Sequence, residues 1–68
     1  MGRKRDSVMF EMVCTAATEN ALRLHLEGED DDSAEWFPRS QLTTEINAKG
    51  DDGSVEMPQW LAREKGFE

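Results

Sequence analysis

Cys14, His25 and Ser40 are residues of the types that serve as nucleophiles or general bases in this 68-residue chain. A catalytic site needs such groups to converge in a pocket that tunes their pKa values. Cys14 occurs in an alternating apolar stretch, so we expect a buried thiol that behaves as a small hydrophobe. His25 alternates with leucines and shares the polar face of its strand with Arg23 and Glu27, which indicates an exposed structural histidine. Ser40 lacks the context of a nucleophile elbow. The sequence therefore predicts that the protein is not an enzyme.

The sequence contains few of the patterns that bind metals or cofactors. One Cys and one His cannot supply the ligand set of a structural zinc ion. The stretch 29–32 offers carboxylate ligands for calcium, but it lacks the spacing of an EF-hand loop. No glycine-rich phosphate loop occurs, so we expect neither a metal nor a cofactor. The lone cysteine cannot form an intramolecular disulfide, which favours the reducing cytoplasm.

The most prominent feature of the sequence is a cluster of acidic residues. Six carboxylates occur within the nine residues 27–35, and their mutual repulsion predicts a surface loop rather than a packed strand. The whole chain carries 15 acidic against 8 basic side chains, a net charge of −7. Residues 1–5 hold three of the basic side chains, and the remainder has 15 acidic against 5 basic, a net charge of −10. The main part of the chain is therefore strongly acidic.

An acidic surface of this kind suits a partner of opposite charge. A Trp and an Arg follow the cluster closely, and an exposed Trp would be an aromatic anchor for an interface. We predict a partner-binding site made of Glu27, Glu29, Asp30, Asp31, Asp32, Glu35, Trp36 and Arg39. The simpler alternative is that the charge only keeps a small protein soluble.

The elements that must position these residues are short and mostly extended. A period of two in hydrophobicity predicts strands at 8–16, 21–27, 35–42, 43–49 and 54–57, and a helix follows at 58–65. The expected fold is mainly β: a small five-stranded antiparallel barrel or curled sheet with one short C-terminal helix. Residues 1–7 are expected to be a basic flexible tail and residues 8–68 a single small β domain.

Several positions give finer expectations for the strands. Pro38 has no N–H for a ladder, so its strand is an edge or ends near the proline. Two aromatic residues compete for the inward position, and we prefer Phe37 and Leu42 inside with Trp36 partly exposed. The stretch 50–53 predicts a tight hairpin, because Asp-Gly readily adopts the positive φ of such turns.

The last eleven residues carry signals for a helix and its termination. Pro58 is expected as the first helical residue, where its missing N–H costs nothing. Gly66 is placed to end the helix in a Schellman motif, with Phe67 contacting an apolar residue of the helix. Trp60, Leu61 and Phe67 are expected to cover part of one face of the sheet.

The length limits what the fold can contain. A domain of this size buries only about 60% of its unfolded surface, so a roomy catalytic pocket is not expected. No apolar run approaches the roughly 18 residues that span a bilayer. No apolar segment typical of a signal peptide follows the basic start. We therefore expect one domain without a membrane partner.

Two stretches have a distinctive pattern. The first reads Glu-Trp-Phe-Pro-Arg-Ser-Gln-Leu at 35–42, and the second reads Met-Pro-Gln-Trp-Leu-Ala-Arg-Glu-Lys-Gly-Phe at 57–67. They resemble a group of short, mostly uncharacterised bacteriophage and prophage proteins, in which such a strand precedes a hairpin and a closing Pro-x-Trp-Leu-Ala helix. The resemblance covers roughly residues 8–67, and this chain adds a longer, more acidic loop at 27–35. It implies a phage or mobile-element origin and an accessory role in the cytoplasm of the host cell.

These observations lead to one leading hypothesis and two alternatives. The leading hypothesis is a non-enzymatic phage-type protein that inhibits or modulates a nucleic-acid-processing host protein by binding its basic surface, with carboxylates imitating phosphates. The first alternative is direct nucleic-acid binding through Trp36, Arg39 and the basic tail, which the negative charge disfavours. The second is a structural or assembly role, in which the strand edge near Pro38 pairs with a copy of itself in a homo-oligomer.

Overall fold

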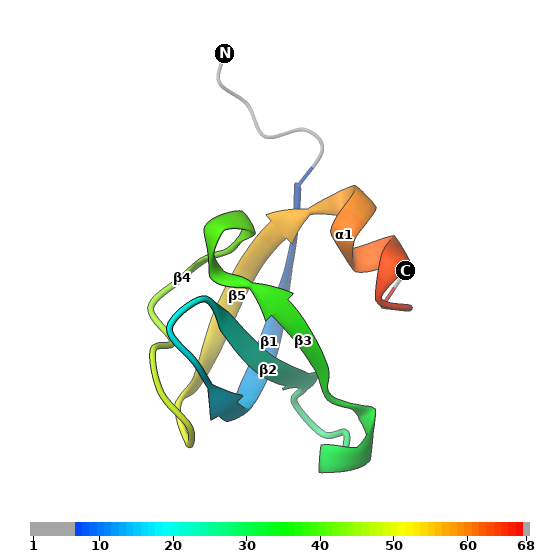
Figure 1. The fold of residues 1–68 in the computed structure, drawn as a ribbon. Helices are drawn as coiled ribbons and strands as arrows, with labels where there is room; N and C mark the ends of the chain where they lie inside the picture. Colours follow the sequence, from blue (N-terminus) through cyan, green and yellow to red (C-terminus); the bar gives the residue numbers. More distant parts are fainter. Residues whose placement is uncertain (1–6, 68) are drawn as a thin grey trace.

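Five antiparallel strands form a single sheet in the computed structural model, which describes residues 7–67 (Figure 1). The strands are β1 (Ser7–Ala17), β2 (Ala21–Leu26), β3 (Glu35–Pro38), β4 (Thr43–Thr44) and β5 (Asp52–Pro58). They lie in the order β3-β2-β1-β5-β4, and one helix, α1 (Gln59–Glu64), follows β5. The mainly β fold with a short C-terminal helix is confirmed, and the sheet is open rather than closed into a barrel.

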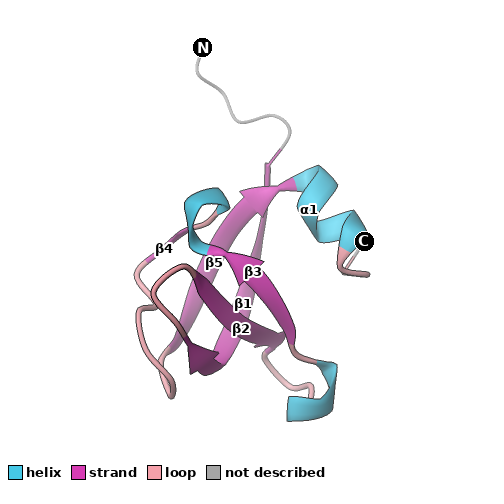
Figure 2. Cartoon of the chain, viewed as in Figure 1, coloured by secondary structure: helices cyan, strands magenta, loops and turns pink. Residues whose placement is uncertain are grey.

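The helical segments lie at the ends of strands, outside the sheet (Figure 2). Besides α1 these are two short 3₁₀ turns, η1 (Asp31–Ser33) and η2 (Arg39–Gln41), which flank β3. The acidic cluster therefore includes η1 and leads directly into an edge strand.

The central strand β1 is hydrogen-bonded on both sides. Its N-terminal part pairs with β5, beginning with Ser7 opposite Pro58, and its C-terminal part pairs with β2. The predicted alternation is confirmed as far as Cys14, since Met12 and Cys14 are buried. Beyond that point a β-bulge at Thr15 breaks the register, so the residues that follow change faces.

Buried apolar side chains from all parts of the chain form one core on a single face of the sheet. The core contains Met12, Cys14, Leu22, Leu24, Phe37, Ile46, Val55, Met57, Leu61 and Ala62. Phe37 is fully buried, whereas 43% of Trp36 is exposed, which confirms the preferred orientation of these two residues. Leu42 packs against the core while remaining partly exposed.

His25 is not exposed as predicted. Only 8% of the residue is accessible, and its Nδ1 atom lies 2.8 Å from the carbonyl oxygen of Leu26. It faces Val13 across the β1–β2 pair, on the side opposite the buried leucines of β2. A period-two pattern identifies the face that a residue occupies, but it does not reveal whether neighbouring segments cover that face.

The strand predicted at 43–49 is much shorter in the structure. β4 contains two residues, and the segment 45–51 is a loop. The hydroxyl of Thr44 donates to the carbonyl oxygen of Ser54 at 2.8 Å and accepts the backbone N–H of Ile46 at 3.1 Å. The second of these bonds turns the chain out of the ladder, so β4 ends there.

The tight hairpin predicted at 50–53 is also wrong. Asp52 belongs to β5 and has no positive φ, whereas Gly50 adopts a φ of 95°. The carboxylate of Asp51 closes the longer loop, because its Oδ2 accepts the backbone N–H groups of Asn47 and Ala48 at 3.0 and 3.1 Å. An aspartate therefore does stabilise a turn here, but the turn is part of the wider loop 45–51.

The strand predicted at 35–42 ends at Pro38. β3 is an edge strand, and the chain continues into η2, where the N–H of Leu42 donates to the carbonyl oxygen of Arg39 at 3.1 Å. Both expected effects of the proline, an edge position and an early end of the strand, are confirmed.

Helix α1 begins after Pro58, whose extended backbone (φ −61°, ψ 145°) makes it the N-cap rather than the first helical residue. The predicted Schellman motif is confirmed at the other end. Gly66 has a φ of 86° and donates to the carbonyl oxygen of Arg63, and the N–H of Phe67 donates to that of Ala62 at 2.8 Å.

The motif directs the ring of Phe67 back onto the sheet. Its centroid lies 5.6 Å from that of Phe37 in a stacked arrangement and 5.9 Å from that of Phe10. Leu61 is buried as expected, but Trp60 is 55% exposed, so the prediction that Trp60 covers the sheet is wrong. Helix α1 has only six residues, and its inward face is filled by Leu61 and its neighbour in the chain.

The expected flexible tail lies almost entirely outside the described residues. Ser7 belongs to β1, and residues 1–6 are not described. Within the described part of the chain, no helix has the length and apolar character that crossing a membrane requires.

Candidate protein-interaction site

The segment 27–35, which we call the acidic loop, connects β2 to β3 and is held by its own backbone. The N–H of Glu29 donates to the carbonyl oxygen of Leu26 at 3.0 Å, and Gly28 supplies the positive φ of that turn. In η1, the N–H groups of Ser33 and Ala34 donate to the carbonyl oxygens of the residues three positions earlier. These turns order the loop, and its carboxylates point outward because all six acidic residues are exposed.

Arg23 in β2 binds the acidic loop from the sheet. One guanidinium nitrogen, Nη1, lies 3.1 Å from Oδ1 of Asp31, and Nη2 donates to the carbonyl oxygen of Asp31 at 3.2 Å. Nη1 also donates to the hydroxyl of Thr15 at 3.1 Å. Thr15 is the bulge residue of β1, so the bulge supplies an acceptor that orients Arg23 toward the loop.

Trp36 lies beside this contact. Trp36 in β3 is the cross-strand partner of Arg23, and 43% of it is exposed. Directly opposite residues of antiparallel strands have Cβ atoms about 5 Å apart, so the indole and the Arg23 side chain are neighbours. Arg23 thereby joins the exposed Trp36 to the acidic loop in one surface.

Seven of the eight predicted site residues lie in the continuous segment 27–36. Within β3, Glu35 is paired with the buried Leu24 and Trp36 with Arg23, so the side chains of Glu35 and Trp36 point to opposite faces of the sheet. Arg39 is engaged elsewhere: its Nε donates to the carbonyl oxygen of Thr18, and both terminal nitrogens donate to Asn47 at 3.0 Å. The sequence pattern missed Arg23 and Thr15, and the outward position of Arg23 beside an acidic loop was the available signal.

The candidate catalytic residues do not converge in the described part of the chain. The thiol of Cys14 points to the core and donates to the carbonyl oxygen of Ala16 at 3.2 Å. His25 occupies the opposite face of the sheet, because its strand neighbour Leu24 is the residue paired with Cys14. A Cys–His pair is therefore absent from residues 7–67.

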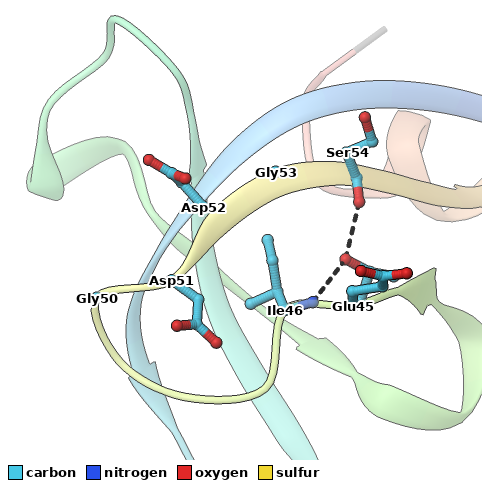
Figure 3. Close-up of a pocket in the computed structure, with 8 residues that line it drawn as sticks. Glu45, Ile46, Gly50, Asp51, Asp52, Gly53 and Ser54 are labelled. Carbon is cyan, nitrogen blue, oxygen red and sulfur yellow. Dashed lines mark hydrogen bonds between the residues drawn. The ribbon is translucent and has the colours of Figure 1, made fainter.

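A shallow hollow lies beside β4 and the 45–51 loop, and it contains three carboxylates (Figure 3). Figure 3 shows the carboxylates of Asp51 and Asp52 directed to different sides of the chain. Oδ2 of Asp51 already accepts two backbone N–H groups, so it has a structural role. Among residues 7–67 no group of three or more His, Cys, Asp or Glu side chains is arranged to hold a metal ion.

No family model, curated protein or solved structure matches this chain. The candidate site is therefore defined by its own geometry: an ordered acidic loop, an arginine that ties it to the sheet, and an exposed tryptophan.

Proposed function

We propose that the protein is a non-enzymatic binding module that docks on the basic surface of a nucleic-acid-processing protein. The observation that carries the proposal is the double contact of Arg23 with Asp31, next to Trp36. It combines an ordered array of carboxylates and an exposed indole in one surface, and such a surface has both the charge and the apolar anchor of a protein interface.

The carboxylates and the Trp36 indole contribute differently to this interaction. In the acidic loop, the carboxylate of Asp31 is paired with Arg23 and that of Glu29 accepts the hydroxyl of Ser33, while all six acidic residues are exposed to an approaching cationic partner. A surface of this sign steers a basic partner toward it and increases the association rate. Burial of the Trp36 indole would then contribute most of the affinity, because aromatic anchors dominate interface energies.

The carboxylates would occupy the positions that phosphates take on the partner. Proteins that process nucleic acids carry basic channels for the phosphate backbone. An acidic loop on a rigid sheet can enter such a channel and exclude the nucleic acid. Together with the resemblance to phage proteins, this supports an accessory role in which the protein inhibits or modulates a host enzyme in the cytoplasm.

The edge of β3 supports a side-chain interface over strand pairing with a second copy. The N–H of Arg39 donates to the carbonyl oxygen of Asn20. This bond shows which residues of β3 direct their backbone groups toward β2, because hydrogen-bonded and non-hydrogen-bonded pairs alternate along an antiparallel ladder. By antiparallel alternation, the backbone groups of Trp36 and Pro38 face outward and those of Phe37 face β2. Pro38 has no N–H, so Trp36 alone would offer a ladder donor within β3.

The test is capture of partners from a bacterial host lysate on the immobilised protein, with duplex DNA as a competitor. The expected result is a retained nucleic-acid-binding protein that added DNA and high salt both release. A variant that neutralises Glu27, Asp30 and Asp32 to the matching amides should bind the partner with about tenfold lower affinity. Asp31 is left intact, because its carboxylate also orders the loop.

The matched control removes three exposed acidic residues outside the acidic loop. Glu19, Glu45 and Glu64 are exposed, and changing them to Gln alters the net charge by the same amount. This control should keep the affinity within about twofold, because charges beyond a Debye length of about 8 Å are screened. Equal losses in both triple variants, or capture that DNA does not compete, would refute the proposal.

A further inference from the structure

The sheet has a second face, opposite the core, which we call the outer face. Met12 of β1 and Leu61 of α1 are buried in the same core, so the helix lies on the core side of the sheet. Residues that alternate with the core residues of β1 point the other way. These are Met9, Glu11 and Val13, and together with their neighbours in β2 and β5 they form the outer face. Met9 is 62% exposed, the highest value among the bulky apolar residues of the described chain.

The register of the ladders places acidic residues around these three side chains. The pairs with β5 are Met9 with Glu56, Glu11 with Ser54, and Val13 with Asp52. On the β2 side, the N–H of Glu27 donates to the carbonyl oxygen of Glu11 at 2.9 Å, so these two residues also lie opposite each other. Directly opposite residues are neighbours on one face of a sheet. The outer face therefore combines an exposed methionine and a half-buried valine with carboxylates from three strands or strand ends.

Positive charge is scarce on this face. The five strands contain one Arg and no Lys, and the guanidinium of that residue, Arg23, is bound to Asp31. The carboxylate of Glu11 accepts the hydroxyl of Ser54, which orders the carboxylate without neutralising it. Like charges that lie directly opposite each other, as at Glu11 and Glu27, destabilise a ladder. Cations from a partner would relieve this repulsion, so the charge of the outer face fits a basic occupant.

The outer face is continuous with the candidate interaction site. Trp36 is paired with Arg23, so it belongs to this face, and 43% of it is exposed. Glu27 is both the first residue of the acidic loop and the neighbour of Glu11. A partner that docks on the acidic loop therefore also reaches the outward side chains of β1.

We propose that the outer face binds a basic amphipathic helix of the partner protein. This inference rests on the proposed function and identifies the element of the partner that makes the contact. From Glu11 to Val13, β1 is hydrogen-bonded to a strand on each side, so the outer face offers side chains there rather than a strand edge. A segment buried against side chains has to satisfy its own backbone N–H and C=O groups, which a helix does and a single extended segment does not.

The dimensions and chemistry of the outer face suit such a helix. Met9 and Val13 are four residues apart in β1, which corresponds to roughly 13 Å at about 3.3 Å per residue. Residues eight apart on one side of a helix span about 12 Å, so two apolar residues of the helix can reach both side chains. The unbranched side chain of Met9 adapts to different apolar partners. Lys or Arg on the flanks of the helix would pair with the carboxylates of the face.

A synthetic peptide tests the proposal on the whole chain. The probe has about 18 residues, with Leu on one side of the helix and Lys on the other. Titration of isotope-labelled protein at physiological salt should change the amide shifts of Met9, Glu11 and Val13 most strongly. The same peptide with a central proline should bind at least about tenfold more weakly, because proline breaks the helix and keeps the charge. Equal binding of both peptides, or shift changes confined to the acidic loop, would overturn the proposal.

Variants of exposed residues locate the contact. Met9→Ala removes the apolar contact, and Glu11→Gln combined with Asp52→Asn removes two charges while leaving Ser54 an acceptor. Each of these two proteins should bind the helical peptide at least about fivefold more weakly than the parent. Parent affinity in Met9→Ala would refute the proposal.

Matched controls lie outside the outer face. Trp60→Ala removes an apolar side chain of α1 that is 55% exposed. Glu19→Gln combined with Glu64→Gln removes two exposed charges, one in the turn between β1 and β2 and one in α1. Both controls should bind the peptide within about twofold of the parent, because distant charges are screened. Losses as large as those of the outer-face variants would refute the proposal.

Capture of the host partner separates this inference from the proposed function. If neutralising Glu27, Asp30 and Asp32 releases the partner while Met9→Ala and the Glu11 and Asp52 double variant retain it fully, the outer-face inference fails and the proposed function stands. If DNA displaces no captured protein, the proposed function fails, and the peptide titration then retains or refutes helix binding by the outer face. Weaker capture by both outer-face variants, with capture unchanged in the controls, would support the two together.

Discussion

Arg39 and Asn47 are joined by two hydrogen bonds: Nη1 donates to the side-chain oxygen Oδ1 and Nη2 to the carbonyl oxygen, both at 3.0 Å. Arg39 follows β3 and Asn47 lies in the loop after β4, so the contact links the segments that follow the two edge strands. These edges do not pair with one another. The side chain of Arg39 bridges the gap that a backbone ladder would fill in a closed barrel.

Replacing Arg39 should therefore reduce stability. Arg39→Ala removes three side-chain hydrogen bonds and should lower the free energy of unfolding by about 2 kcal/mol, measured by urea denaturation. Arg39→Lys should recover little of it, because an ammonium group cannot reproduce the planar set of donors. Arg63→Ala, an exposed arginine on α1, is the control and should change stability by less than about 0.5 kcal/mol. An Arg39→Ala protein as stable as this control would contradict the bridging role.

The contact between Arg23 and Asp31 should order the acidic loop more than it stabilises the fold. The two side chains are 28% and 65% exposed, and surface ion pairs contribute at most about 1 kcal/mol. Arg23→Ala should therefore leave the global stability nearly unchanged. Hydrogen exchange should nevertheless accelerate at the amides of Ser33 and Ala34, which donate within η1. Unaltered exchange there would show that the backbone turns alone hold the loop.

Phe67 should be important for stability despite its position near the end of the described chain. Its ring stacks on Phe37 and also contacts Phe10, so Phe67→Ala should cost about 3 kcal/mol in a thermal or urea unfolding experiment. Trp60→Ala removes a larger aromatic side chain from the same region but should cost less than about 1 kcal/mol, because Trp60 is mostly exposed. The reverse order of these two losses would contradict the packing described above.

Gly66 allows the chain to turn and place Phe67. Its φ of 86° is one that other residues rarely adopt, and nothing lies within 4 Å of the position where a Cβ atom would stand. Gly66→Ala should therefore cost about 1 kcal/mol through backbone strain alone, without a steric clash. Gly66→Asn should cost less than Gly66→Ala, since Asn tolerates this conformation better. Equal stabilities of the glycine and alanine proteins would argue against the Schellman motif.

The sequence predicted the parts of the fold that depend on local interactions. The alternation up to Cys14, the surface loop of six carboxylates and the glycine that ends α1 all follow from neighbours in the chain. The same holds for the edge position of β3, which Pro38 imposes. Patterns of this kind need no knowledge of tertiary contacts.

The predictions that failed depend on contacts between distant residues. The loop at 45–51 replaces a strand because Thr44 and Asp51 accept backbone N–H groups, and His25 is buried although its pattern is that of an outward residue. Arg39 was expected at the partner-binding site, but its acceptors come from segments 8 and 21 positions away. Propensity and periodicity contain no information about such partners.

The double pairing of β1 has a consequence for the order in which the chain folds. β1, β2 and β3 are joined by short connections, so their ladders require little loop closure. The ladder between β1 and β5 joins residues from 39 positions apart, Val13 with Asp52, to 51 positions apart, Ser7 with Pro58. Such contacts raise the contact order and slow folding. The three-stranded meander should therefore form early, and the arrival of β5 along the exposed side of β1 should be the slow step that completes the core.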